Sequence, residues 1–223
     1  MTLAGKRIVI SGGAGILGQG VAEVAQGQGA SVTLLDIAPP SDDLIGDLMQ
    51  VDLTDPQSLK RAFEQVGDFD VLANIAGGFA MGPSVFETED ELWDEMFFIN
   101  VKTLRRVLNE AVPRLLAAGR GSVINVGALG ALRGAANMGA YLASKSVVMR
   151  LTESLSEEVK AAGVNVNAVL PTVIDTPRNR ADMPNTDPAN WVDPKDLGQV
   201  ICFLGSDAAK AVHGALVPVS GLS

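Results

Sequence analysis

The sequence predicts an α/β fold in a single domain spanning residues 1–223, with a doubly wound parallel sheet of about seven strands and helices on both faces. Three observations lead to this fold. Short apolar segments alternate with helix-like segments along the whole chain. The joints between them are short, which favours parallel strands joined by helical crossovers. The strand-like segments are apolar at almost every residue, as in strands buried on both faces of a sheet.

The first half of the chain contains a glycine cluster, and then strands and helices in regular alternation. Strands are expected at 6–11, 31–36, 48–53 and 69–77, and helices at 16–29, 55–67 and about 89–118. Asp55 is a favourable N-cap and Pro56 suits the first helical position, so the second helix is expected to begin there. Pro113 lies within the long helical region, and we expect an interruption near it.

The second half continues the alternation. Strands are expected at 121–127, 164–171 and 214–221, and helices at about 139–162 and at 193–206. Between them, residues 171–194 form an irregular stretch rich in Pro, Asp and Asn. Loops of this length inside a compact domain tend to be functional lids, so we expect a lid here.

The composition narrows the class of protein. A formal net charge of −9 argues against a nucleic-acid partner. No apolar run reaches the roughly eighteen residues of a membrane span, and the first strand is too short for a signal peptide. Cys202 and His213 are the single cysteine and histidine, so neither a disulfide framework nor a metal site is expected. These features favour a cytoplasmic enzyme with a small-molecule substrate.

The glycine cluster, "SGGAGILG", occupies residues 11–18 between a predicted strand and a predicted helix. Three of its glycines follow the spacing G-x-G-x-x-G, which lets a backbone approach a pyrophosphate at a helix N-terminus. An ordinary glycine-rich turn is the alternative, but the context favours a dinucleotide cofactor. We expect cofactor contacts from Gly12, Gly13, Gly15, Ile16, Leu17 and Gly18.

Asp36 ends the second strand, about 20 residues beyond the glycine cluster. A carboxylate at this position accepts hydrogen bonds from ribose hydroxyls and repels a 2′-phosphate. No Lys or Arg follows closely, so NAD(H) is preferred over NADP(H), although the acid could simply end a strand.

Tyr141 and Lys145 are four residues apart and therefore share one face of a predicted helix. The ammonium could lower the tyrosine pKa, which is otherwise about 10, and so allow proton transfer to a substrate. By itself the pair would equally suit an ordinary amphipathic helix.

Taken in order, these features resemble the short-chain dehydrogenase/reductase family and its Rossmann-type fold over nearly the whole chain. The other matching motifs are Asp52-Leu53, "NIAG" at 74–77, Asn100 and "YLASK". The resemblance implies that Tyr141 is the acid/base, that Lys145 binds the nicotinamide ribose and that Asn100 holds a water in a proton relay. It also implies cofactor contacts from Asp52, Leu53, Asn74, Ala76, Gly77, Tyr141, Lys145, Pro171, Ile174 and Thr176.

The chain departs from the family pattern at three positions. Ile75 replaces a second asparagine, Thr172 replaces a glycine, and Ala128 stands where the family has its catalytic serine. Loss of one donor aimed at developing charge can cost roughly 10²–10³ in rate. Ser144 and Ser146 are expected to face away from Tyr141 and not to replace that serine.

Quinonoid dihydropteridine reductases, a subgroup of that family, also have alanine in place of the serine. The lid sequence "DTPRNRADMPNTDPANW", residues 175–191, resembles their corresponding segment. An electrophilic quinoid imine needs less polarisation than a ketone, so such a substrate is expected. Either some of Phe79, Met81, Arg178 and Trp191 contact substrate, or Asp175, Arg178, Asn179 and Arg180 brace the lid while Trp191 plugs it.

Two further functions stay open. One is a general carbonyl or alcohol oxidoreductase, and the other is a non-catalytic NAD(H)-binding sensor. Self-association as a homodimer or homotetramer is expected from the family resemblance, through the two long helices, whose apolar spacing could face a partner.

Overall fold

The structure, a computed structural model, describes residues 2–222. One seven-stranded sheet has the order β3-β2-β1-β4-β5-β6-β7, and all its pairings are parallel. The predicted doubly wound α/β fold of the Rossmann type is therefore confirmed. The strands are β1 (Arg7–Ser11), β2 (Ser31–Asp36), β3 (Asp47–Gln50), β4 (Val71–Asn74), β5 (Gly121–Val126), β6 (Val164–Pro171) and β7 (Leu216–Val219).

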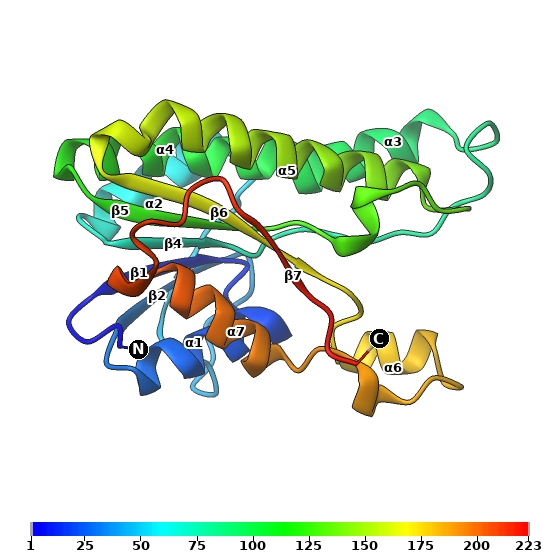
Figure 1. The fold of residues 1–223 in the computed structure, drawn as a ribbon, viewed down its shortest axis with the longest axis horizontal. Coiled ribbons are helices and arrows are strands. Elements are labelled where there is room, and N and C mark those ends of the chain that lie inside the picture. Colours follow the sequence, from blue (N-terminus) through cyan, green and yellow to red (C-terminus); the bar gives the residue numbers. More distant parts are fainter. Residues whose placement is uncertain (1, 223) are drawn as a thin grey trace.

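Helices cover both faces of this sheet (Figure 1). The helices α1 (Ile16–Gly27) and α7 (Pro194–Leu204) pack on one face, and α2 (Pro56–Val66), α4 (Thr103–Ala118) and α5 (Gly139–Val159) pack on the other. The remaining helices are α3 (Asp90–Phe97), α6 (Pro177–Asp182), the π-helix η1 (Phe98–Lys102) and the 3₁₀ turns η2 (Leu129–Leu132), η3 (Lys160–Ala162), η4 (Pro188–Asn190) and η5 (Asp207–Ala209).

Strand order reverses between β1 and β4, since the chain moves outward from β1 through β2 to β3 and then returns to β4. In open α/β sheets, ligands bind in the crevice at the carboxyl ends of the strands beside such a reversal. The glycine cluster follows β1 and "NIAG" begins at the end of β4, so the fold brings both motifs to that crevice.

The long helical region differs from the prediction. Its regular winding changes at η1, within residues 98–102, whereas Pro113 lies inside the continuous helix α4. Val107, Ala111 and Leu115 on the buried face of α4 pack into the core on both sides of this proline, which holds the helix together despite the missing N–H. The predicted interruption near Pro113 was wrong.

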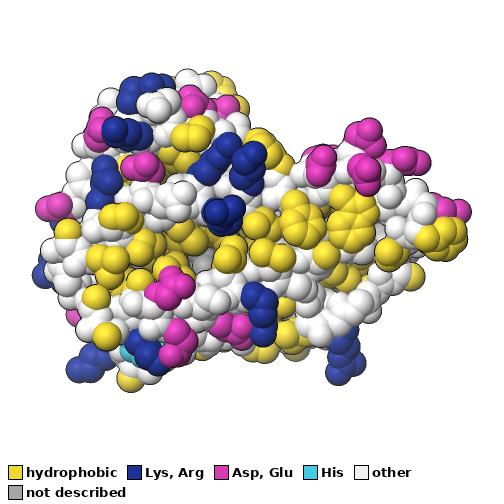
Figure 2. All heavy atoms as spheres, turned by 90° about the horizontal axis from the view of Figure 1, so that it is seen from above, with side chains coloured by type: hydrophobic (Ala, Val, Ile, Leu, Met, Phe, Trp, Pro, Cys, Tyr) yellow, Lys and Arg dark blue, Asp and Glu magenta, His cyan; other side chains and the backbone are white. Residues whose placement is uncertain are grey.

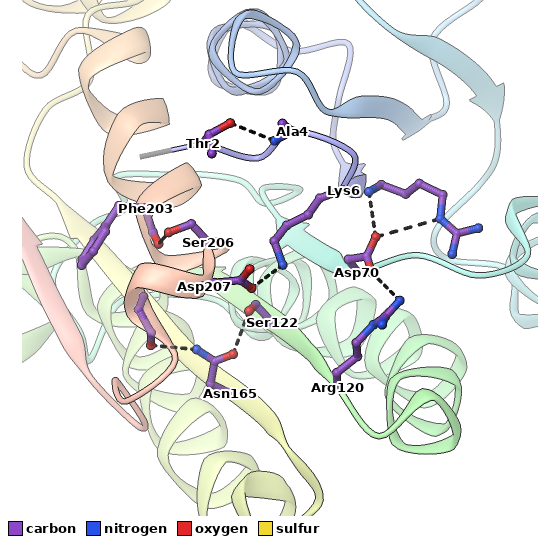
Figure 3. A network of polar contacts seen from close by, with 12 residues as sticks. Thr2, Ala4, Lys6, Asp70, Arg120, Ser122, Asn165, Phe203, Ser206 and Asp207 are labelled. Carbon is purple, nitrogen blue, oxygen red and sulfur yellow. Dashed lines mark hydrogen bonds and ion pairs between the residues drawn. The ribbon is translucent and has the colours of Figure 1, made fainter.

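Polar contacts close the opposite, amino end of the sheet (Figure 3). Asp70 accepts a hydrogen bond from the backbone N–H of Arg7 at 2.9 Å and lies 3.5 Å from the Arg120 guanidinium. Lys6 pairs with Asp207 at 2.7 Å, which ties the start of the chain to η5. The carboxyl end of the sheet is thus the face on which a site can open.

Candidate active site

Glycines in the cluster after β1 are required by close backbone packing. Gly12 has φ +73°, and a Cβ there would lie 2.7 Å from the backbone nitrogen of Ala76. A Cβ at Gly13 would lie 2.7 Å from the side chain of Leu34, and one at Gly18 only 2.3 Å from the carbonyl oxygen of Gly12. The loop therefore folds tightly against "NIAG" and against its own helix.

The start of α1 suits an anion. Gly15 is its N-cap and supplies no side-chain hydrogen bond, so the first helical N–H groups keep their donor capacity. Ile16 is exposed at the first position of the helix, while Leu17 is buried in the core. The glycine cradle and the uncapped helix fit the pyrophosphate of a dinucleotide.

Asp36 lies beside this loop and braces it. Its carboxylate accepts hydrogen bonds from the backbone N–H of Ala14 at 3.0 Å and of Ala38 at 3.1 Å. The acid at the end of β2 is therefore fixed next to the cradle, in the place that an adenosine ribose would require.

Asp52 and Leu53 follow β3 in a short turn. The Asp52 carboxylate accepts hydrogen bonds from the hydroxyl of Thr54 at 2.6 Å and from its N–H at 2.7 Å, and these bonds lower the pKa of Asp52. The Arg106 guanidinium donates to the Thr54 carbonyl and so holds the same turn against α4. Leu53 packs against the core under α2.

Asn74 and its neighbours are tied into the sheet. The Asn74 amide donates to Asn125 Oδ1 at 2.8 Å, and Asn125 in turn donates to the Thr152 hydroxyl at 2.9 Å. The N–H groups of Ile75 and Ala76 both donate to the carbonyl of Ser11. Asn74 thus supports the site from inside the sheet, and the turn after β4 is fastened to the end of β1.

Asn100 lies in the π-helix and is buried. Its Oδ1 accepts from the Gly78 N–H at 2.9 Å, while its Nδ2 donates to the Gly78 carbonyl at 3.1 Å and to Ser144 Oγ at 3.0 Å. A Cβ at Gly77 would lie 2.7 Å from Asn100 Oδ1 and 3.2 Å from Lys145 Nζ. Asn100 and Lys145 therefore meet around Gly77.

Tyr141 and Lys145 both project from the first turns of α5. The Lys145 ammonium donates to the Val126 carbonyl at 2.9 Å, and burial lowers its pKa to about 8. Burial also raises the pKa of Tyr141 to about 12. This shift is opposite to the one expected from the ammonium, and its cause is desolvation of the phenolate by burial.

Ala128 stands in an apolar environment beside the tyrosine. It is 6% exposed and belongs to a cluster with Leu142 and Leu170, against which Tyr141 packs. Ser146 donates to the Ala131 carbonyl at 2.8 Å, and Ser144 donates to the Tyr141 carbonyl at 2.7 Å. Neither serine hydroxyl replaces the missing donor, as predicted.

Residues 175–191, the predicted lid, make most of their polar contacts with one another or with their neighbours in the chain. Arg180 makes two 2.6 Å contacts with Asp175, and Asn179 donates to the Ile174 carbonyl at 2.8 Å. Thr176 caps α6 by accepting from the Asn179 N–H. Trp191 is only 5% exposed, in agreement with the plugging alternative.

Five further residues complete the outline of the site. Pro171 ends β6 and is buried, and Thr172, which replaces a glycine, donates its hydroxyl to the Ser220 carbonyl at 3.0 Å. Arg178 is exposed and lies 3.6 Å from Asp182. Of the candidate substrate contacts, Phe79 packs edge-on against Tyr141, and Met81 is exposed.

Within residues 2–222, no group of three or more His, Cys, Asp and Glu side chains is arranged to hold a metal ion. Within the same range no helix is long and apolar enough to cross a membrane.

The comparisons with known proteins agree with this geometry. Residues 12–221 match the family described as enoyl-(acyl carrier protein) reductase. The cis-4-hydroxycyclohexanecarboxylate dehydrogenase of Sinomonas cyclohexanicum is 31% identical, over 96% of this chain and 94% of its own.

Two solved structures with bound cofactors are similar over nearly their whole lengths. Carveol dehydrogenase from Mycobacterium avium, in complex with NAD, has a TM-score of 0.86 and 27% identity, covering 97% of this chain and 96% of its own. A protein assigned as 2-deoxy-D-gluconate 3-dehydrogenase from Agrobacterium tumefaciens, with bound NADP, has a TM-score of 0.89 and 30% identity, covering 99% and 96%.

Proposed function

The chain belongs to the short-chain dehydrogenase/reductase family and is an oxidoreductase, and from that premise we propose that it transfers hydride from NADH to an activated C=N or quinoid substrate. A quinonoid dihydropterin is the substrate of this class that the lid sequence favours. The nicotinamide cofactor itself is supported by the relatives that carry NAD or NADP.

The observation that carries this proposal is the apolar surface around Ala128. Tyr141 is left as the hydroxyl donor of the site, because Ala128 supplies a methyl group and Ser144 and Ser146 are committed to backbone carbonyls. A ketone would lose the second donor and with it roughly 10²–10³ in rate. A quinoid ring that is already electrophilic needs less polarisation.

In the proposed mechanism a bound NADH would supply a hydride to a carbon of the conjugated substrate. Tyr141 gives its phenolic proton to the substrate nitrogen or oxygen that gains the electron pair. Burial raises the pKa of Tyr141 and so keeps the hydroxyl protonated at neutral pH, while a nearby positive charge would be needed to ease release of its proton. Lys145 would hold the nicotinamide ribose and stabilise the phenolate, which a water beside Asn100 would reprotonate.

NADH is proposed over NADPH because of Asp36. Its carboxylate is fixed beside the glycine loop by the N–H groups of Ala14 and Ala38. A 2′-phosphate placed next to this carboxylate would be repelled.

A second candidate is a carbonyl or alcohol oxidoreductase, which the relatives named as dehydrogenases of hydroxy compounds favour. In that case Tyr141 alone would polarise an ordinary carbonyl group. Substrate preference separates the two candidates, since the second predicts comparable turnover on simple ketones and on quinoid compounds.

Self-association is proposed through α4 and α5. A groove of about 400 Å³ runs between these helices and is lined by Leu108, Val112, Pro113, Leu151 and Leu155 among others. Figure 2 shows apolar side chains gathered on the face of the molecule that carries these helices. Sedimentation velocity tests the proposal, and a monomer at working concentrations would contradict it.

NADH oxidation is the test of the proposed reaction, with quinonoid dihydropterin compared with a panel of simple ketones. We expect turnover on the pterin that is lost in Tyr141→Phe while NADH binding is retained. Lack of pterin turnover, with ketones reduced instead, would favour the second candidate. Activity that survives Tyr141→Phe would remove the tyrosine from the reaction, and binding of NADH without any turnover would leave a sensor.

A further inference from the structure

Ser144 is fully buried, with 0% of its surface exposed, and it lies between Tyr141 and Lys145 on α5. It was expected to turn away from the tyrosine ring, and both hydrogen bonds of its hydroxyl go to other groups. The same hydroxyl nevertheless donates to the backbone carbonyl of Tyr141 at 2.7 Å. Ser144 is therefore bonded to the turn of helix that carries the proton donor.

The second contact of Ser144 reaches a distant part of the chain. Its Oγ accepts a hydrogen bond from Asn100 Nδ2 at 3.0 Å, across 44 positions of sequence. With both Nδ2 hydrogens used by Ser144 and Gly78, and Oδ1 used by Gly78, the orientation of the Asn100 amide is fixed. Without the serine hydroxyl, one buried amide hydrogen would lose its partner.

The hydrogen bond between Asn100 and Ser144 connects to the residues that are proposed to act on cofactor and substrate. Asn100 and Lys145 both approach Gly77. A Cβ at that glycine would lie 2.7 Å from Asn100 Oδ1 and 3.2 Å from Lys145 Nζ. Lys145 is held in turn by the Val126 carbonyl. A shift of α5 relative to the π-helix would move Tyr141 and Lys145 together relative to the crevice.

We propose that Ser144 is a positioning residue, which sets the register of the Tyr141 turn against Asn100 and Gly78 for proton transfer. The proposal rests on the proposed function, because it takes Tyr141 to be the proton donor. Ser144 does not contact substrate and acts only through Asn100 and the backbone of α5.

Ser146 provides a matched control. It lies on the same helix, and it also donates its hydroxyl to a backbone carbonyl, that of Ala131, at 2.8 Å. Ser144→Ala and Ser146→Ala thus each remove one hydroxyl from α5, and only the first removes the bond to Asn100.

The experiment measures kcat, the KM for NADH, and the pH profile of kcat for both variants. For Ser144→Ala we expect kcat to fall about tenfold, because a buried hydrogen bond is lost and the donor is misplaced. The apparent pKa of the proton donor should shift, while the KM for NADH stays close to that of the wild type. Ser146→Ala should leave the pH profile unchanged, and Ser144→Cys, whose sulfur keeps a weak acceptor for Asn100 and a weak donor, should recover part of the rate.

Equal kcat values and equal pH profiles for folded Ser144→Ala and Ser146→Ala would overturn the proposal. If Ser144→Ala does not fold, the same comparison with Ser144→Cys decides, and parity with Ser146→Ala has the same meaning. Tyr141→Phe separates this result from a failure of the proposed function. If that variant remains active, the tyrosine is not the donor; if it is inactive while Ser144→Ala matches its control, only the positioning role fails.

Discussion

The Phe79 ring meets the Tyr141 ring edge-on, with centroids 4.9 Å apart and an interplanar angle of 80°. Phe79 lies beyond the end of β4, whereas Tyr141 lies in the first turn of α5, so the contact joins these two parts of the chain. Phe79 is 39% exposed, which leaves part of its ring free to line the approach to the tyrosine. Tyr141, the proposed proton donor, thus has an aromatic neighbour in addition to the apolar cluster that contains Ala128.

Phe79→Ala should raise the KM for a flat conjugated substrate about tenfold, because an aromatic contact of roughly 1 kcal/mol and part of the apolar wall are lost. The KM for a small aliphatic ketone should change less. Steady-state kinetics on both substrates measure this, with Phe86→Ala as the control, since Phe86 is 88% exposed. The same change in KM for both substrates would show that Phe79 does not select the ring.

Ala128→Ser should restore a second donor next to Tyr141. Turnover of simple ketones should rise by about 10²-fold, since a donor aimed at the developing charge has a value of this order. Turnover of a quinoid substrate should change little, because it is already polarised. Ala131→Ser introduces the same hydroxyl at a neighbouring buried position of the same cluster and should not raise the ketone rate. An unchanged rate in Ala128→Ser would mean that ketones are limited by something other than the missing donor.

Asp36→Ser should weaken the discrimination between NADH and NADPH by about tenfold or more, because it removes the charge that repels a 2′-phosphate. Fluorescence titration with each cofactor measures the ratio of dissociation constants. Asp42→Ser is the control, since Asp42 is an exposed acid in the loop that follows β2. A cofactor ratio that is the same in both variants would assign the preference to another residue.

Lys145→Met should change how stability depends on pH. Burial lowers the pKa of Lys145 to about 8, whereas the unfolded chain keeps it near 10.4. Between these values the unfolded state binds more protons, so the free energy of unfolding of the wild type rises with pH. Burial of the Lys145 charge therefore lowers the free energy of unfolding by its full amount below pH 8. This destabilisation disappears as the pH approaches about 10.4.

Urea unfolding from about pH 7.5 to 9 should show the wild type gaining about 1 kcal/mol relative to Lys145→Met. Tyr141 and Cys202, whose pKa values burial raises to about 12, titrate in both proteins and cancel in the difference. Lys60→Met, at an exposed position of α2, should follow the wild-type profile. A constant difference between wild type and Lys145→Met across this range would refute the lowered pKa.

Local sequence patterns predicted the fold and several residues of the candidate site. The glycine spacing, the acid at Asp36 and the four-residue interval from Tyr141 to Lys145 each reflect one turn or one strand end. The alternating apolar segments predicted the parallel sheet, because a strand buried on both faces is apolar at almost every residue.

Features that depend on contacts between residues far apart in the sequence were not predicted. The π-helix at residues 98–102 changes the helical winding but leaves too little trace in the apolar period to be predicted from it. Pro113 predicted an interruption that the structure lacks, because tertiary packing supports the helix around it. The hydrogen bond from Asn100 to Ser144 joins residues with no local relation. The raised pKa of Tyr141 reflects burial, which a single sequence does not display.

The close packing of α1 on α7 has a consequence for biosynthesis. A Cβ at Gly20 would lie 2.8 Å from Pro194, and one at Gly198 would lie 3.1 Å from the Gly20 carbonyl oxygen. The two helices therefore bury part of each other's surface. On the ribosome α1 and the strands beneath it are made long before α7. Until about residue 204 has left the exit tunnel, the side of α1 that faces α7 has no native partner, and the nascent chain must be kept from aggregating by other means.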